Sequence, residues 1–400
     1  MTDPRAERGA ELARQVADFL ATHDPAASEP LEFLRARFDA GLAWVAYPEG
    51  YGGQGLPRAL QPDVDRAFEE AGAPSNRPEV NGIGLGMAAP TILAFGTEEQ
   101  KQRFLRPLWT GEEIWCQLFS EPGAGSDLAN VSTRAVRDGD EWVVNGQKVW
   151  TSGAHNAAFA ILVARTDPDA VKHAGLTYFL CPMTDPGVEV RPLRQITGEA
   201  EFNEVFLSDV RIPDSQRLGA VGEGWKVANA TLNNERVAIG SGGGREAGMI
   251  GRVAQTWREH PERHTAELQD RLLRLWVDAE AARITGRQLA QKLASGQPGP
   301  EGSMMKLLFA NTAQALSGLE VELLGEDGLR FEDEQGWEMV RPGKVSFTGR
   351  DAGYRYLRAK GNSIEGGTSE IIRNIVSERV LGLPSEHRTD KDRPWKELAK

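Results

Sequence analysis

Between residues 114 and 222 the sequence consists of short strand-forming runs separated by turn residues, whereas both flanks carry helical periodicity. The runs are 141–144, 148–150, 158–164, 176–181, 188–193 and 204–207. Asn145-Gly146 is a strong hairpin signal, so we expect a turn there. A block of short strands with helices on both sides predicts a compact β-domain inserted between two helical regions.

The flanks are expected to be helical for most of their length. Before the β-block, apolar residues recur with helical spacing over 7–38, broken near Pro25 and Pro30, and then over 60–72, 84–95 and 97–108, where Thr97 predicts a helix start. After it, helices are expected at 225–257, 263–295 and 301–324, and a last one from Thr368 to Gly382. The charged tail from Arg388 to Lys400 is expected to be mobile or to lie on a partner.

This pattern predicts an α+β protein of three domains. They are an N-terminal helical domain (1–113), a central β-barrel or β-sandwich domain (114–222) and a C-terminal helical bundle (223–400).

Composition narrows the function classes. The formal net charge of −12 argues against nucleic acid or an anionic membrane as the main partner, although local positive charge suffices for an anionic ligand. The two cysteines lack metal-type spacing and the six histidines form no cluster, so we expect no metal and a reducing, cytoplasmic setting. The first residues lack the apolar core of a signal peptide, and no apolar run reaches membrane-spanning length.

Two segments of the β-block, 117–127 and 145–153, carry the clearest chemistry. Ser120 and Ser126 place hydroxyls on a turn interrupted by glycines, where backbone N–H groups can approach a ligand closely. Trp150 offers a broad apolar face and Ser152 another hydroxyl. The set suits a flat heteroaromatic ring with polar edges; the alternative is an ordinary hairpin with a loop.

Together with the blocks 361–374 and 322–328, these segments resemble the acyl-CoA dehydrogenases, a family of FAD enzymes. The resemblance implies α,β-dehydrogenation of an acyl-CoA thioester, a tetramer (homomeric or heteromeric) and an electron-transfer flavoprotein as oxidant. It implies that FAD is bound by Gln117, Phe119, Ser120, Trp150, Ser152, Thr368 and Glu370, and, in a neighbouring subunit, by Glu322 and Gly325. It further implies that Ser126 and Arg236 bind substrate and that the Gly366 N–H donates to the thioester carbonyl.

The catalytic base departs from the commonest family pattern. Many relatives place a carboxylate immediately before the Gly-Thr of the last block, where this chain has Gly366. A second subset places a glutamate before an arginine on the first long helix after the β-domain, which corresponds here to Glu235 before Arg236. Glu235 is therefore the expected base and Glu365 the runner-up; the alternative for Glu235 is an ordinary surface glutamate.

A second departure concerns the cofactor. The Arg-x-x-Phe-Gly motif with which relatives hold the pyrophosphate of a partner's FAD is absent from 256–264, where Arg258 or Arg263 might substitute or might be plain surface charges. Two alternatives stay open: a non-catalytic or partner-dependent subunit of a heteromeric dehydrogenase, and an acyl-CoA oxidase.

The glycines indicate the size of the substrate. Gly366 leaves out a side chain beside the expected reacting carbons, and the glycines of 240–244 keep a nearby helix thin. We therefore expect an acyl group that is bulky or branched near those carbons.

Overall fold

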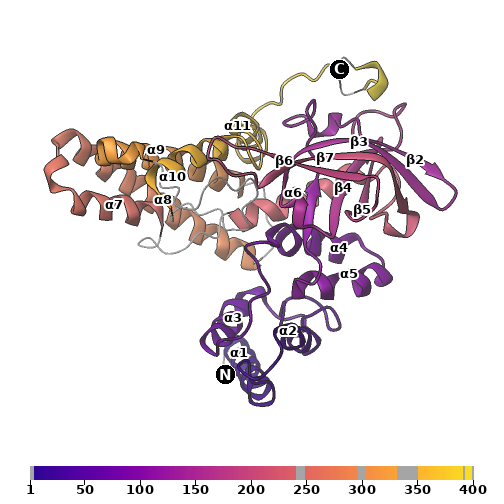
Figure 1. The fold of residues 1–400 in the computed structure, drawn as a ribbon, viewed down its shortest axis with the longest axis horizontal. Helices are drawn as coiled ribbons and strands as arrows, with labels where there is room; N and C mark the ends of the chain where they lie inside the picture. The colour runs from indigo at the N-terminus through magenta and orange to yellow at the C-terminus, as the bar shows by residue number, and fades with distance from the viewer. Residues whose placement is uncertain (1–3, 240–247, 296–301, 331–349, 391, 399–400) are drawn as a thin grey trace.

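A computed structural model describes residues 4–239, 248–295, 302–330, 350–390 and 392–398. The N-terminal helices, the sheet and a long helical arm formed by α7 to α10 extend in three directions, and α6 lies where they meet (Figure 1). The expected α+β class, with a β-domain between two helical regions, is confirmed. The domain boundaries at 113 and 222 stay a prediction.

The helices follow the sequence expectations closely. Those before the sheet are α1 (Pro4–Thr22), α2 (Pro30–Asp39), α3 (Gln61–Glu70), α4 (Ala89–Phe95) and α5 (Glu98–Thr110). Those after it are α6 (Gly224–Ile239), α7 (Met249–Glu259), α8 (Ala266–Ser295), α9 (Gly302–Leu324), α10 (Ala352–Ala359) and α11 (Ser369–Ile375). The expected 225–257 helix corresponds to α6 and α7, and its residues 240–247 lie outside the described part of the chain.

The β-domain is a seven-stranded sheet of β1 (Trp115–Leu118), β2 (Arg134–Asp138), β3 (Glu141–Ser152), β4 (Phe159–Arg165), β5 (Leu176–Pro182), β6 (Val188–Leu193) and β7 (Phe202–Pro213). Strands run in the order β1-β4-β2-β3-β7-β6, and β5 pairs with β4. Residues of β4 that point to one face, such as Leu162, pack against β3 and β7, whereas Ile161 and Val163 face the helices. Burial on both faces explains why β4 and β5 are nearly continuous apolar runs.

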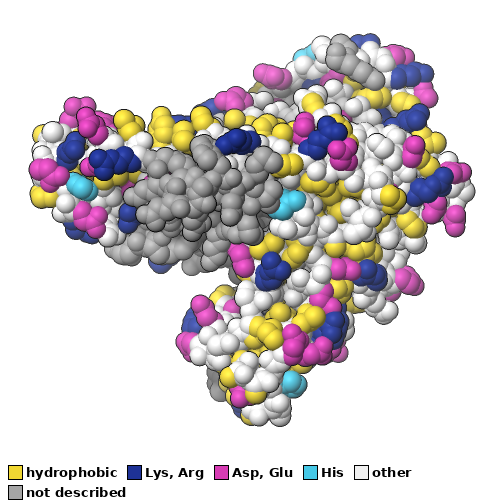
Figure 2. Space-filling model, in the orientation of Figure 1, with side chains coloured by type: hydrophobic (Ala, Val, Ile, Leu, Met, Phe, Trp, Pro, Cys, Tyr) yellow, Lys and Arg dark blue, Asp and Glu magenta, His cyan; other side chains and the backbone are white. Residues whose placement is uncertain are grey.

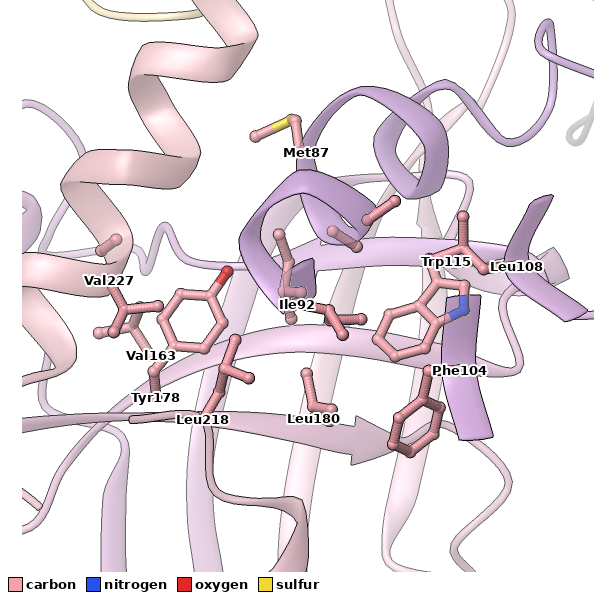
Figure 3. Packing of buried hydrophobic residues seen from close by; sticks show 14 of the residues in the cluster. Met87, Ile92, Phe104, Leu108, Trp115, Val163, Tyr178, Leu180, Leu218 and Val227 are labelled. Atoms are coloured by element: carbon pink, nitrogen blue, oxygen red, sulfur yellow. The ribbon is translucent and has the colours of Figure 1, made fainter. Parts of the chain in front are cut away.

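One hydrophobic core joins the sheet to the helices. Met87 and Ile92 from the N-terminal helices meet Tyr178 and Leu180 of β5 and Val227 of α6 (Figure 3). Trp115 of β1 stacks on Phe159 of β4, with ring centroids 5.1 Å apart. Parts of all three regions therefore pack against the same cluster.

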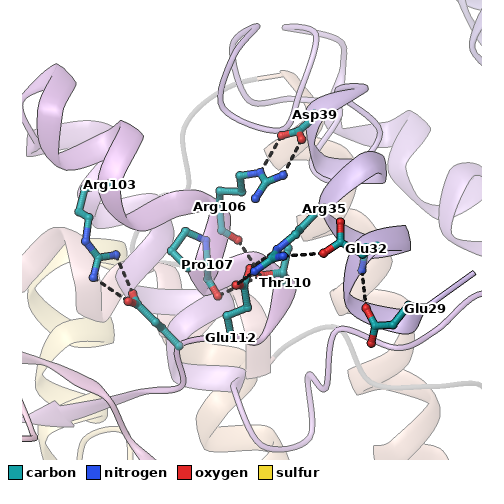
Figure 4. A network of polar contacts seen from close by, with 10 residues as sticks. Glu29, Glu32, Arg35, Asp39, Arg103, Arg106, Pro107, Thr110 and Glu112 are labelled. Atoms are coloured by element: carbon teal, nitrogen blue, oxygen red, sulfur yellow. Dashed lines mark hydrogen bonds and ion pairs between the residues drawn. The ribbon is translucent and has the colours of Figure 1, made fainter.

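Charged residues brace the N-terminal helices. Arg106 of α5 binds Asp39 at the end of α2 at 2.6 Å, and Arg103 of α5 binds Glu113, just before β1, at 2.7 Å (Figure 4). Arg35 of α2 pairs with Glu112. These pairs are largely exposed, so they orient the helices more than they stabilise them. Elsewhere on the face shown in Figure 2, acidic and basic side chains are intermixed.

Two expectations are wrong. Asn145-Gly146 is not a turn, because β3 continues through it with a register shift against β7, and the hairpin to β2 turns at Gly139-Asp140. Asn145 is held in the sheet by Asp209 of β7, whose carboxylate accepts from the Asn145 amide at 2.9 Å. The described part of the tail is not free either: it packs on the chain's own β-domain, with Trp395 buried.

Candidate active site

The segments 117–127 and 145–153 lie side by side. The Val149 N–H donates to the Ser120 carbonyl at 2.9 Å, which places the end of β1 beside the end of β3. Trp150 follows with its indole 62% exposed and a left-handed φ of 59°. A bulky residue rarely adopts that backbone conformation, and such strain concentrates at functional sites. The exposed ring therefore presents a flat apolar surface next to the half-buried hydroxyls of Ser120 and Ser152.

A buried ion pair between Lys148 and Glu121 links the two segments that carry Ser120 and Trp150. The Lys148 ammonium donates to Glu121 and to the carbonyls of Phe119 and Val163, each at 2.9 Å. Glu121 also accepts from the N–H groups of Ser132 and Thr133, at 2.7 and 2.9 Å. The pair fixes the beginning of the Ser126 loop to β3 and β4.

The charge state of this pair follows from its surroundings. Burial alone raises the pKa of Glu121, but Lys148 and the hydrogen bonds outweigh it and bring that pKa down to about 2. Burial lowers the pKa of Lys148 while Glu121 opposes that shift. Because a carboxylate and two carbonyl oxygens surround the ammonium, we take both groups as charged at neutral pH.

The second part of the candidate site is the turn that opens α11. Gly366 and Gly367 adopt left-handed φ values of 63° and 96°, which suit glycine and strain other residues. Lys306 of α9 donates to the Gly367 carbonyl, and the Thr368 hydroxyl caps α11 by accepting from the Ile371 N–H at 3.2 Å. The left-handed backbone gives a physical reason for a glycine, rather than a carboxylate residue, at position 366.

Arg358 of α10 joins the two parts. Its guanidinium lies 3.0 Å from Glu365, beside that turn, and 3.3 Å from Glu201, just before β7. It also lies 5.8 Å from the ring of Phe202, whose other neighbour is the Trp150 indole at 6.0 Å. Burial raises the pKa of Glu201, Arg358 opposes that shift, and Glu199 and Glu365 add to it. Glu201 is thus a carboxyl with a raised pKa one residue before the ring that packs against Trp150, and perturbed carboxyls of this kind cluster at functional sites.

α6, which carries Glu235 and Arg236, is anchored to two other elements. Thr231 lies one turn before Glu235, and its hydroxyl lies 3.0 Å from that of Thr91 on α4 and 3.0 Å from that of Tyr178 on β5. The side chains of Glu235 and Arg236 lie outside the described part of the structure, so their roles stay predictions.

Glu322 and Gly325 lie elsewhere. Glu322 is 16 positions after Lys306 on α9, which corresponds to about 24 Å along a helix. It pairs with Arg271 of α8 at 2.6 Å, while Arg263 lies against Gly325, where an added Cβ would come within 2.3 Å of the guanidinium. Within one subunit these residues are therefore separate from Trp150 and Thr368, as expected if they act on a neighbour's cofactor.

Sequence models of known families match the chain in three consecutive parts. They are the N-terminal domain (residues 5–112), middle domain (116–210) and C-terminal domain (222–381) of acyl-CoA dehydrogenase. The chain belongs to the acyl-CoA dehydrogenase family.

Individual relatives agree. Acyl-CoA dehydrogenase IpdE1 of Mycobacterium tuberculosis is 40% identical over 87% of this chain and 86% of its own. Among solved structures, the Tcur3481-Tcur3483 steroid ACAD superposes with a TM-score of 0.72 at 28% identity, covering 96% of this chain and 98% of that one. The ChsE4-ChsE5 complex from Mycobacterium tuberculosis gives 0.70 at 30% identity, with coverage of 96% and 99%.

Acyl-CoA dehydrogenases depend on FAD, and the residues present fit its ring system. An exposed tryptophan, two half-buried serines and a glycine turn at the start of α11 match a flat ring whose edges accept and donate hydrogen bonds. Phe119 differs from the others, because its side chain is buried against Tyr178 and its carbonyl accepts from Lys148. Gln117 is partly exposed and Glu370 pairs with Arg373 at 3.4 Å; their roles stay predictions.

Several residues of the candidate site were not predicted from the sequence. Glu121 and Lys148 lie in the segments 117–127 and 145–153. A lysine among inward-facing strand residues is a sequence signal for a buried ion pair. Arg358 and Glu201 carry no comparable local signal, because only the fold brings them together.

Proposed function

We propose that this chain dehydrogenates an acyl-CoA thioester between its α and β carbons with bound FAD, as a tetramer in the cytoplasm, and that an electron-transfer flavoprotein takes up the electrons. The observation that carries the proposal is the connection through Arg358. Arg358 contacts Glu365 beside the Gly366–Thr368 turn and lies 5.8 Å from the Phe202 ring, which packs against Trp150; this chain of contacts supports one shared site for a ligand with a ring and a thioester.

The chemistry assigns a task to each residue. In this proposal the Glu235 carboxylate accepts the α-proton, and the β-hydrogen leaves with its electron pair as the carbon–carbon double bond forms. FAD, when bound, supplies the acceptor for that hydride. The Gly366 N–H donates to the thioester carbonyl and stabilises the negative charge that develops there.

Two observations favour Glu235 over Glu365 as the base. Both oxygens of Glu365 accept from Arg358, at 3.2 and 3.0 Å, so this carboxylate is held in a two-point ion pair and is not free to approach a substrate. Glu235 instead lies one turn beyond Thr231, on the part of α6 that is anchored to α4 and β5.

The test is Glu235→Gln, which keeps the shape of the side chain and removes the base. We expect flavin content to be unchanged and turnover to fall by at least about 10²- to 10⁴-fold. Glu365→Gln is the matched control and should keep most of the activity. Activity of Glu235→Gln within threefold of wild type would remove it from the mechanism.

The acyl group is proposed to be bulky or ring-bearing near the reacting carbons. Gly366 offers no side chain there, and the similar Tcur3481-Tcur3483 protein is a steroid ACAD. We expect a higher kcat/KM for cyclohexanecarboxyl-CoA than for butyryl-CoA with an artificial electron acceptor. A clear preference for butyryl-CoA would contradict this substrate class.

A second candidate is a subunit that needs a different chain for activity. The similarity to the Tcur3481-Tcur3483 steroid ACAD and to the ChsE4-ChsE5 complex favours it, as does the absence of the Arg-x-x-Phe-Gly motif from the sequence. Arg263 beside Gly325 is the residue that would replace that motif in a homotetramer. If the enzyme is homomeric, the chain purified alone should retain flavin and turn over acyl-CoA, and the Arg263→Ala variant should lose flavin. If the chain purified alone never retains flavin, the second candidate is supported.

A further inference from the structure

The C-terminal tail docks on the β-domain through one isolated bridge and two backbone hydrogen bonds, and its residues Trp395–Glu397 form a 3-10 turn. Val171 and Pro394 form an antiparallel bridge, and the N–H groups of Trp395 and Lys396 donate to the carbonyls of Ala170 and Pro168 at 3.0 and 3.1 Å. In Figure 1 the chain after α11 crosses towards the sheet and ends beside it. The docked residues, 392–398, are far in sequence from the loop they cover.

The docked tail also contacts the loop of residues 121–131, which carries Ser126. The Trp395 indole N–H donates to Asn130 at 2.8 Å, and its ring lies 4.4 Å from the guanidinium of Arg165. That buried guanidinium donates to the carbonyls of Ala129 and Val131 at 2.6 and 3.2 Å. The indole therefore covers the arginine that shapes the end of the loop.

Lys172 makes a second connection closer to Ser126. Its ammonium donates to Asp127 at 2.8 Å and to Asp390 of the tail, and only 7% of the residue is exposed. The neighbouring His173 packs edge-on against Trp225 at the start of α6, with centroids 4.9 Å apart. The loop that carries Lys172 thus contacts the tail, the Ser126 loop and the beginning of the helix that carries Glu235.

We propose that Lys172 and Trp395 are positioning residues, through which the docked tail holds the Ser126 loop in the shape that binds the CoA thioester. The role in ligand binding rests on the proposed function. The tail acts on substrate affinity and leaves the chemical step unchanged, because neither residue belongs to the base, the Gly366 turn or the Trp150 surface.

The test compares flavin-loaded Trp395→Ala and Asp390→Ala with wild type, and uses Lys396→Ala as the control. Lys396 pairs with Asp169 on the surface and does not touch the 121–131 loop. Hydrogen exchange is measured without substrate, and steady-state kinetics with cyclohexanecarboxyl-CoA. Asp390→Ala is included because it removes a half-buried carboxylate without opening a cavity in the core, so the proposal can still be tested if Trp395→Ala fails to fold.

We expect amide exchange within 123–131 to become at least about tenfold faster in both variants, with the remaining strands unchanged. The KM should rise about tenfold, which is about 1.4 kcal/mol of binding, while kcat stays within twofold. Unchanged exchange in the loop would overturn the proposal, and faster exchange with an unchanged KM would overturn the role in binding. If wild type turns over no acyl-CoA at all, the proposed function fails, while the exchange result still decides whether the tail positions the loop.

Discussion

Lys148 illustrates, at the scale of a single residue, how a buried charge can define a site. Replacing it with methionine leaves the Glu121 carboxylate buried without its cation, so Lys148→Met should destabilise the protein by about 3–5 kcal/mol in urea unfolding. Glu121→Gln in the same chain removes the orphaned charge and should restore part of that loss. If the free energy of unfolding of Lys148→Met lay within about 1 kcal/mol of the wild-type value, the pair would contribute little to stability.

The same carboxylate predicts a pH dependence. The pKa of Glu121 falls from its ordinary 4.5 to about 2 in the folded protein, so its contribution to stability is complete above pH 4.5. It is then lost as the pH falls from 4.5 towards 2. We expect the stability difference between wild type and Glu121→Gln, measured by urea unfolding, to shrink over that interval. A constant difference would mean that the carboxylate is not stabilised by folding.

Trp150 and Ser152 are predicted to differ in their effect on the cofactor. Trp150→Ala removes a stacking surface, whereas Ser152→Ala removes a single hydrogen bond of about 0.5–1.5 kcal/mol. Gel filtration followed by flavin absorbance should therefore show a greater loss for Trp150→Ala. Trp150→Gly is a useful companion, because the left-handed φ should make it at least as stable as the alanine variant. Full flavin retention in all three would refute the expected contact.

At the scale of elements, β3 shows how neighbours override a local signal. Gly146 lies within the strand at a position that has no room for a side chain. An added Cβ there would come within 2.3 Å of the Thr133 hydroxyl and 2.7 Å of the Thr133 Cα. Gly146→Ala should therefore cost about 1–3 kcal/mol in urea unfolding. Gly123→Ala is the matched control, because nothing lies within 4 Å of its Cβ position. Equal stabilities would contradict the close packing of Thr133, just before β2, on Gly146 of β3.

The elements also show which features a sequence can predict. The helix start at Thr97 was correct because its capping box with Gln100 is a contact between residues three apart. The Asn145-Gly146 turn was wrong because Asp209, more distant in sequence, holds Asn145 in the sheet. The tail was misjudged for the same reason, since Asn130 and Lys172 decide where it lies. Of the site, the family motifs supplied Trp150 and Thr368, while the linking Arg358 required the fold.

At the scale of the whole molecule, α8 carries an apolar stripe. Leu273, Val277 and Ile284 are 58%, 66% and 47% exposed, and their spacing of four and seven positions places them on one side of the helix. Val277→Glu should weaken the proposed tetramer and lower its mass in light scattering, whereas Asp278→Lys, on the adjacent exposed position, should not. An unchanged mass for Val277→Glu would show that the stripe is outside the subunit contacts.

The core shared by Met87, Tyr178 and Val227 has a consequence for how such chains diversify. Each of the three family segments contributes side chains to that cluster. Exchanging one segment between relatives would therefore replace only part of the packed side chains. The side chains that face each other in the core would then come from different proteins, and we expect their volumes to pack less well. We therefore expect loop and single-glycine changes to be tolerated more readily than the exchange of a whole segment between relatives.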